Sequence, residues 1–342
     1  MTSPARWNVE VHAWRGSIRE SRHRVLLALA DADGGLRASG GDPATVTTFR
    51  SAAKPFQLLP FVERGHARRW ALGDEELAAM AASHTGSRRH VALVRGLLER
   101  FGVSEGQLAC GYHEPFDAQS LADVRRDPGL ASPVFNNCSG KHAGMLALCR
   151  AEGWPLEGYE LADHPLQRLM RQTVGEVCGL AAEAVALAVD GCSVSVFGLP
   201  LVAMATGYAR LASARADGSP REQALARIRT AMGGHPFAVG GHDRFDTELM
   251  TATGGRMIAK VGAEGLECVA IVERGLGLAV KCEDGSARAA GPATLAVLDR
   301  LGLLAVSERE RLAAAHRPTV ASVRGRVVGT IEAVIDVLEP VA

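Results

Sequence analysis

A serine and a lysine three residues apart, Ser51 and Lys54, are the residues of this chain best suited by type and spacing to act together. On a helix, side chains at positions i and i+3 lie on one face, so the Ser51 hydroxyl and the Lys54 amine can meet. A serine hydroxyl is a weak nucleophile until a neighbouring base takes its proton, and a lysine held neutral in a dry pocket is such a base. The spacing therefore predicts a nucleophilic serine activated by a lysine.

The pattern Ser-x-x-Lys is also the nucleophile motif of penicillin-binding proteins and class A β-lactamases. The motif is short, and the 18 serines and four lysines of the chain would give about 0.2 such pairs by chance. The rarity of lysine makes it more specific, because only four of the 38 basic residues are lysines: Lys54, Lys141, Lys260 and Lys281. Arginine keeps its proton in a protein whereas lysine can release it, so we expect these lysines to serve as amines. The alternative is that they are ordinary surface lysines.

Composition excludes several classes of protein. The formal net charge of the 342 residues is zero at pH 7 and aromatic residues make up only 5%, so the chain has neither the charge that attracts nucleic acid nor the rings on which bases stack. No stretch approaches the roughly 18 apolar residues of a membrane span, and residues 1–15 lack the apolar core of a signal peptide. We therefore expect a cytoplasmic protein with a small-molecule substrate and with no nucleic-acid or membrane partner.

Seven loosely spaced cysteines argue against a disulfide framework and favour a reducing compartment. Two of them lie in polar segments. Cys138 is three residues before Lys141 in the dense polar run 136–146, and Cys192 follows Asp190 in an Asp-Gly-Cys turn. We expect the other five to be small buried side chains, as isolated cysteines usually are: Cys110, Cys149, Cys178, Cys268 and Cys282.

The elements that must position these residues follow from periodicity and from helix-start signals. Strands over residues 7–49 deliver Ser51 to a strand-to-helix junction, where free backbone N–H groups can hold an oxyanion. Strands return over residues 266–291 and 324–338. Strands at both chain ends around about 200 mostly helical residues predict an α+β fold with an antiparallel sheet.

We expect one catalytic unit, residues 1–342, with two lobes. The sheet lobe comprises about residues 1–50 plus 255–342, and the mostly helical lobe about 51–254. Between two predicted helices, Ser83 and His84 form either a polar loop or a second catalytic element. The glycine-rich segment 233–260, which ends on Lys260, is typical of a binding-site rim rather than of a linker.

Taken together, several of these segments resemble the asparaginase II family, the rhizobial-type L-asparaginases. The resemblance covers roughly residues 8–335. The matching segments, in the order of the family, are residues 50–57, 83–86, 136–146, 190–201, 244–250, 260–265 and 275–281.

The resemblance implies hydrolysis of L-asparagine to L-aspartate and ammonia by a homodimer. The implied fold is similar to the serine β-lactamases and penicillin-binding proteins, an antiparallel sheet flanked by helices with a mostly helical insert. Two serine–lysine pairs are implied at the site, Ser51 with Lys54 and Ser83 with Lys260. Arg50 is implied to contact the substrate.

The resemblance also implies a zinc ion near the site, held by Cys138, Lys141 and Cys192. Spacing alone would not suggest this set, because two isolated cysteines are more often core residues. His84, like Arg50, is implied to contact the substrate, and Asp190 is implied as a substrate-binding residue with a water nearby.

One departure from the family lies in the loop after Asp190. Ser193 and Ser195 stand where the family has a glycine and then a proline. The resemblance therefore implies the reaction class more firmly than the substrate preference.

Three alternatives remain open on the sequence. One is a β-lactamase-like or peptidase-like acylase that uses the same chemistry on another amide. The second is an enzyme whose main substrate is glutamine. The third is a non-catalytic protein that binds zinc or an amino acid, which the retention of all four serine and lysine positions disfavours.

Overall fold

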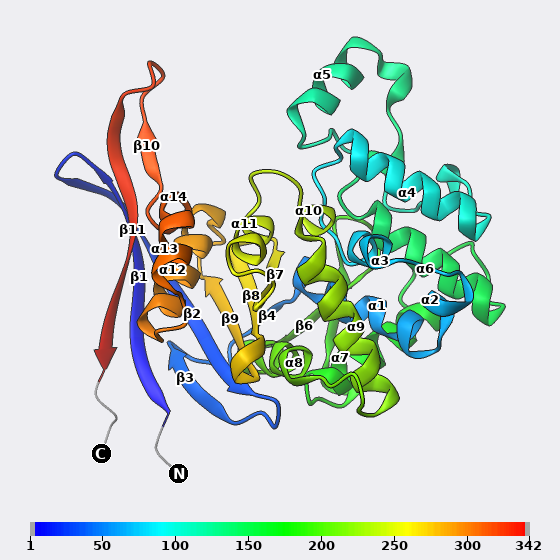
Figure 1. Ribbon diagram of the computed structural model, residues 1–342, viewed down its shortest axis with the longest axis horizontal. Coiled ribbons are helices and arrows are strands. Elements are labelled where there is room, and N and C mark those ends of the chain that lie inside the picture. Colours follow the sequence, from blue (N-terminus) through cyan, green and yellow to red (C-terminus); the bar gives the residue numbers. More distant parts are fainter. Residues whose placement is uncertain (1–3, 339–342) are drawn as a thin grey trace. The chain divides into compact units, whose positions relative to one another are not determined.

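The computed structural model describes residues 4–338, which fall into two compact units (Figure 1). The first unit contains the chain up to Ala52, the segment Leu199–Ser213 and the chain from Glu248 onward. The second unit contains Ala53–Gly198 and Ala214–Thr247. Ser51 belongs to the first unit and Lys54 to the second.

The first unit is built on an eight-stranded sheet in the order β10-β11-β1-β3-β2-β9-β8-β7. Its central pairs join the two ends of the chain: Val9 on β1 is opposite Ile335 on β11, and Val25 on β2 is opposite Cys282 on β9. These pairs are antiparallel, whereas β1 and β3 pair in parallel over a short stretch. The strands are β1 (Ala5–Arg15), β2 (Ile18–Asp31), β3 (Leu36–Gly40), β7 (Met257–Gly262), β8 (Leu266–Ile271), β9 (Leu276–Cys282), β10 (Thr319–Ala321) and β11 (Val327–Leu338).

Two helices, α8 (Leu201–Ser213) and α12 (Ala287–Arg300), pack against this sheet. The backbone of α8 approaches β9 so closely that a Cβ atom at Gly277 would lie 2.0 Å from the Ala205 carbonyl oxygen. Only glycine allows this approach. The segment Leu201–Ser213 therefore groups with the sheet, whereas the expected division assigned it to the helical lobe. The α+β class and the antiparallel sheet flanked by helices are confirmed.

The first unit also holds β4 (Val46–Thr48), the 3-10 turn η1 (Arg50–Ala53) that leads into the second unit, α13 (Val306–Arg311) and α14 (Ala313–His316). The helix α11 (Phe245–Ala252) spans the boundary at Thr247. The sequence interpretation missed β7 and α11. It also divided the last strand in two, whereas residues 327–338 form one strand.

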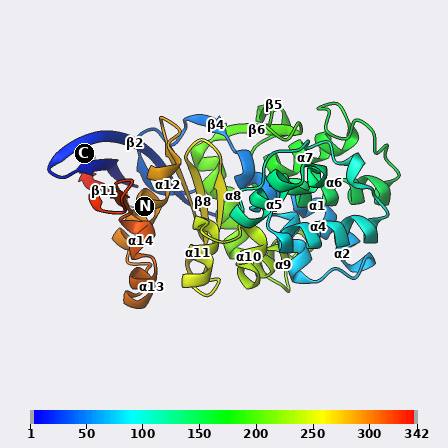
Figure 2. The ribbon, with the colours of Figure 1, turned by 90° about the horizontal axis from the view of Figure 1, so that it is seen from above.

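The second unit is helical and is centred on α1 (Lys54–Glu63), which packs against α6, α7 and α9 (Figure 2). Every residue of α1 from Lys54 to Val62 is buried, as expected of a helix enclosed by others. The other elements are α2 (His66–Arg69), α3 (Asp74–Met80), α4 (Arg88–Phe101), α5 (Ala118–Arg126), α6 (Ser139–Glu152), α7 (Pro165–Val177), the hairpin β5 (Ala186–Val189) and β6 (Ser195–Pro200), α9 (Pro220–Gly234) and α10 (Pro236–Val239).

Helix starts in the second unit largely follow the sequence signals. Ser87 caps α4 by accepting a hydrogen bond from the backbone N–H of His90, as its position predicted. The sequence Asp163-His164-Pro165 predicts Asp163 as the cap of α7. That prediction is wrong, because His164 takes this role and accepts from the backbone N–H of Leu166. His164 has the extended backbone that a following proline favours.

Within residues 4–338, no helix combines the length and the apolar character that crossing a membrane requires.

Candidate active site

Lys54 is the first residue of α1 and its side chain is only 1% exposed. Its Nζ lies 2.8 Å from Ser83 Oγ, and it also donates to the carbonyl oxygens of Ala82 and, at 3.4 Å, Asn137. The structure thus brings Lys54 together with Ser83, which the resemblance had placed in a pair with Lys260. The buried contact is a short path for proton transfer between an amine and a hydroxyl.

Ser83 lies in the loop between α3 and α4 and is itself buried. Its backbone N–H donates to the Val239 carbonyl at 2.9 Å, and the next N–H, that of His84, donates to the Asn137 carbonyl at 3.2 Å. The loop is therefore buried and fixed on two sides by backbone bonds, and a catalytic role for Ser83 and His84 stays a prediction.

His84 is fully buried, with both ring nitrogens engaged inside the second unit. Nδ1 accepts from the backbone N–H of Gly86 at 3.1 Å, and Nε2 lies 2.9 Å from Ser139 Oγ. Burial, with smaller contributions from His90 and Lys54, holds the pKa of His84 well below its ordinary value. The ring is therefore neutral at physiological pH.

Cys138, Lys141 and Cys192 converge, although they come from the start of α6 and from the β5–β6 turn. All three are buried, and Lys141 Nζ lies 3.0 Å from Cys192 Sγ. A hydrogen bond from Cys192, aided by the charges of Lys54 and Lys141, lowers the pKa of Cys138 well below its usual range. Burial opposes the charge on Lys141, but the two thiols and Asp190 raise its pKa above the ordinary value.

The three side chains can be compared with the ligands that the implied zinc ion would need. Two thiolates suit zinc, and a lysine amine can complete a set only after losing its proton. Among residues 4–338, no group of three or more His, Cys, Asp or Glu side chains is placed to hold a metal. The side chains that come together here are the thiols of Cys138 and Cys192 and the amine of Lys141. Asp190 lies beside them, with Oδ2 3.8 Å from Cys192 Sγ. The convergence of the three residues fits zinc if binding of the metal displaces the proton that the thiols and Asp190 help to keep on Lys141.

Ser193, the departure from the family loop, has a left-handed backbone with φ of 73°. It closes the turn between β5 and β6, where its N–H donates to the Asp190 carbonyl and the Asp190 N–H donates to the Val194 carbonyl. Left-handed backbone favours glycine, which agrees with the glycine of the family at this position. Ser193 therefore holds this turn at a cost in backbone strain.

Arg50 and Ser51 lie in η1, immediately before the boundary with the second unit. Arg50 has a left-handed backbone with φ of 44°, a strained conformation of the kind found at functional sites. The turn is anchored inside the first unit, because the hydroxyl of Tyr208 on α8 donates to the Ala52 carbonyl at 2.8 Å. Ser51 thus lies at the predicted strand-to-helix junction, and its contact with Lys54 stays a prediction.

Lys260 lies on β7 and its side chain is fully buried. Its Nζ donates to the Val261 carbonyl at 3.0 Å. A fully buried lysine on a strand is costly unless its amine has partners. Its pairing with Ser83 stays a prediction.

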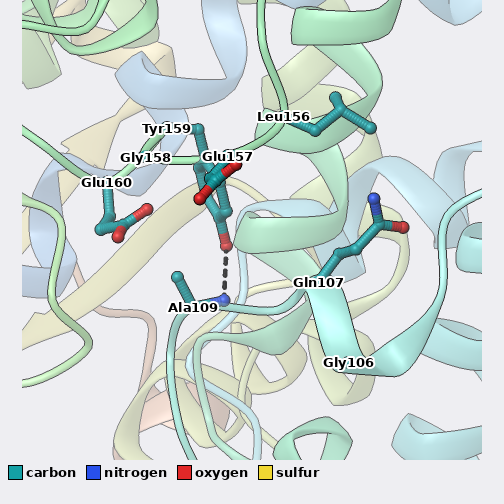
Figure 3. Close-up of a pocket in the computed structure, with 8 residues that line it drawn as sticks. All are labelled: Gly106, Gln107, Ala109, Leu156, Glu157, Gly158, Tyr159 and Glu160. Carbon is teal, nitrogen blue, oxygen red and sulfur yellow. Dashed lines mark hydrogen bonds between the residues drawn. The ribbon is translucent and has the colours of Figure 1, made fainter.

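Sequence reasoning missed the hydrogen bond between Tyr159 and His142, the residue that follows Lys141. The Tyr159 hydroxyl accepts from the Ala109 backbone N–H at 2.9 Å (Figure 3) and lies 2.5 Å from Nδ1 of His142. Tyr159 lines a cavity of about 290 Å³ with Glu157 and Glu160 at its edge, and none of the predicted catalytic residues lines it. Tyr159 carries no motif of its own in the sequence, so only the fold reveals the link.

The chain matches one known protein family over nearly its whole length. The model of the family L-asparaginase II matches residues 11–333. The chain therefore belongs to the L-asparaginase II family. A search of curated protein sequences finds no match.

Solved structures similar to the chain include Mglu in its native form in the presence of 4.3 M NaCl, with a TM-score of 0.43 and 17% identity over 84% of this chain. The chain spans 60% of the length of that Mglu structure. A β-lactamase from Mycobacterium bovis matches with a TM-score of 0.40 and 14% identity over 85% of this chain and 95% of its own.

Proposed function

We propose that the chain is an L-asparagine amidohydrolase that releases L-aspartate and ammonia through a serine activated by lysine. Membership of the L-asparaginase II family supports the reaction class. The observation that carries the proposed chemistry is the buried hydrogen bond between Lys54 Nζ and Ser83 Oγ.

In the proposed mechanism, neutral Lys54 takes the proton of the Ser51 hydroxyl, and the Ser51 oxygen attacks the side-chain amide carbon of the substrate. Backbone N–H groups at the start of α1 hold the oxyanion, and such a donor contributes about 2.7–4 kcal/mol. The C–N bond then breaks, ammonia leaves with a proton relayed through Ser83, and water releases aspartate from the serine ester. Arg50 binds the substrate carboxylate as a bidentate partner. Lys260 is proposed as the second amine of the site.

The proposed zinc ion would be held by Cys138, Lys141 and Cys192. When bound, it would supply a fixed positive charge that holds the two thiolates together and shapes the floor of the site. Asp190 would order a water beside it. We assign the attack to Ser51 rather than to a metal-bound water, because a serine beside a lysine already provides a nucleophile.

The test is ammonia release from L-asparagine, compared with L-glutamine at equal concentration. Release from L-asparagine with a kcat/KM at least about tenfold higher than for L-glutamine supports the proposal. Preference for L-glutamine would change the proposed substrate to L-glutamine and leave the proposed serine–lysine chemistry unchanged. A stable covalent adduct with a penicillin, together with no ammonia from either amino acid, would overturn the proposed substrate class.

A homodimer stays part of the proposal. The measurement is light scattering coupled to size-exclusion chromatography, in which twice the mass of the 36.0 kDa chain supports it. A monomer that remains active would remove the dimer from the proposed function.

A further inference from the structure

The ring of His84 has both of its polar positions occupied within the second unit. The Gly86 N–H donates to Nδ1, so this nitrogen carries the lone pair and the neutral ring carries its proton on Nε2. Nε2 then donates to Ser139 Oγ at 2.9 Å, and the Ser139 hydroxyl donates to the Val134 carbonyl at 2.8 Å. The direction of every proton in this chain of three hydrogen bonds is fixed.

The same chain of bonds braces the residue before His84, which is Ser83. The Asn137 carbonyl accepts both from the His84 backbone N–H, at 3.2 Å, and from Lys54 Nζ, at 3.4 Å. Two residues further along, Ser139 holds the His84 ring. One short segment at the start of α6 therefore orients both the lysine and the loop that carries the serine.

We propose that His84 and Ser139 are positioning residues, which keep Ser83 Oγ within hydrogen-bond distance of Lys54 Nζ, and that His84 does not bind the substrate. This inference rests on the proposed function, because it concerns the same site. An imidazole offers two polar atoms, and both are used here in a side chain with no exposed surface. A bond from the substrate to the ring would have to break one of the two existing bonds.

The kinetic test compares Ser139→Ala with Ser120→Ala. Ser120 is a matched control, because it is 1% exposed and its hydroxyl has no hydrogen-bond partner among residues 4–338. Loss of the Ser139 hydroxyl removes the hydrogen bond to Nε2 of His84. We therefore expect kcat to fall by about tenfold or more while KM changes by less than about twofold. Ser120→Ala should match the parent in both constants.

Substitutions of His84 itself separate positioning from binding. A glutamine side chain reaches the Ser139 side and can donate an amide N–H there, whereas alanine cannot. His84→Gln should therefore retain about tenfold more kcat than His84→Ala, with KM near the parent value in both. A rise in KM of more than about tenfold at unchanged kcat in either variant would overturn the inference and make His84 a substrate contact.

A spectroscopic test needs no turnover. The ¹⁵N spectrum of the histidine-labelled parent should show Nδ1 of His84 unprotonated and Nε2 protonated, and Ser139→Ala should shift the Nε2 signal. A parent protein with the proton on Nδ1 would overturn the inference whether or not the protein is an asparaginase. Absence of ammonia release with the expected tautomer would instead contradict only the proposed function.

Discussion

Lys54 Nζ lies 2.8 Å from Ser83 Oγ, while two backbone carbonyls, those of Ala82 and Asn137, accept from the same amine. A buried amine at this distance from a hydroxyl can exchange a proton with it. The contact is the basis for proposing Lys54 as a proton acceptor, and the role of Ser51 stays a prediction.

Alanine substitution distinguishes the proposed roles of Ser51 and Ser83. We expect Ser51→Ala to lower kcat by at least about 10³-fold, because removal of a nucleophile leaves only the effect of binding and of the oxyanion donors. Ser83→Ala should lower kcat less, by about 10²-fold, as expected for a group that relays a proton. Ammonia release measures both, and mass spectrometry should find a trapped acyl group on Ser51. An acyl group on Ser83 would exchange the two roles.

Ser193→Gly should stabilise the protein. The left-handed backbone of Ser193 costs about 1–2 kcal/mol in a residue with a Cβ atom, and the extra freedom of glycine in the unfolded chain offsets part of the gain. The expected net increase in the free energy of unfolding is about 0.5–1 kcal/mol in urea titrations. Ser195→Gly, on strand β6, is the control and should destabilise by a similar amount. Destabilisation by both substitutions would show that the strain at Ser193 is compensated locally.

Gly140→Ala should damage both stability and activity. A Cβ atom at Gly140 would lie 2.2 Å from the Ala79 carbonyl oxygen, so α6 would have to move away from α3. The expected loss in the free energy of unfolding is about 1–3 kcal/mol, and kcat should fall because α6 also carries Ser139 and Lys141. Gly96→Ala in α4 is the control: nothing lies within 4 Å of its Cβ position, so it should stabilise by about 0.5–1 kcal/mol. Equal behaviour of the two variants would contradict the predicted clash.

Glu308 should make stability depend on pH. Burial alone would raise its pKa, but bonds from Arg256 at 2.6 Å and from the Ala305 N–H lower it below the ordinary value of 4.5. The stabilising contribution is therefore present above pH 4.5 and disappears as the pH falls through the lowered pKa. Glu308→Gln should destabilise by about 1–3 kcal/mol at pH 7, and the difference from the parent should shrink in acid.

The control for this pH dependence is Glu310→Gln on the same helix, α13, where the side chain is exposed. Its free energy of unfolding should follow that of the parent at every pH. A constant gap between parent and Glu308→Gln from pH 7 to pH 3 would mean that packing, rather than charge, accounts for the loss.

The proposed zinc ion can be removed and measured. Elemental analysis of the purified protein should find zinc in a 1:1 ratio to the chain, and Cys138→Ser or Cys192→Ser should lower this ratio by about tenfold or more. Chelation should lower the melting temperature, because a ligand that binds only the folded state stabilises it. Cys178→Ser replaces another buried cysteine, one outside the proposed metal site, and should keep the metal. Full activity of metal-free protein would confine zinc to a structural role.

The sequence predicted the features that depend on local patterns. The junction at Ser51, the cap of α4 at Ser87 and the helix that follows the polar run 136–146 all appear where residue types require them. In contrast, β7 was missed because every residue of Met257–Lys260 is buried, so the strand has no alternation to reveal it. The helix α5 lies in residues 102–135, which the sequence predicted to be rich in loops; it has only nine residues and few apolar ones.

Contacts between distant residues were beyond the sequence patterns. Lys54 and Ser83 are 29 positions apart, and Lys141 and Cys192 are 51 apart, so only the packing of α1, α6 and the β5–β6 turn brings them together. The resemblance named these four residues as parts of a site, and that role stays a prediction. It did not indicate that Lys54 contacts Ser83, nor that both ring nitrogens of His84 are already bonded.

The pairing of β2 with β9, in which Val25 faces Cys282, bears on how the protein is made. While the polypeptide emerges from the ribosome, β1 to β3 must wait with open hydrogen-bonding edges until β9 and β11 are synthesised. Most of the second, helical unit lies between β3 and β9 in the sequence. It can fold before β9 is synthesised, because domains generally fold as they are completed. Exposed edges are prone to aggregation, so slow translation of residues 53–247 should lower the soluble yield, and a chaperone that shields strand edges should restore it.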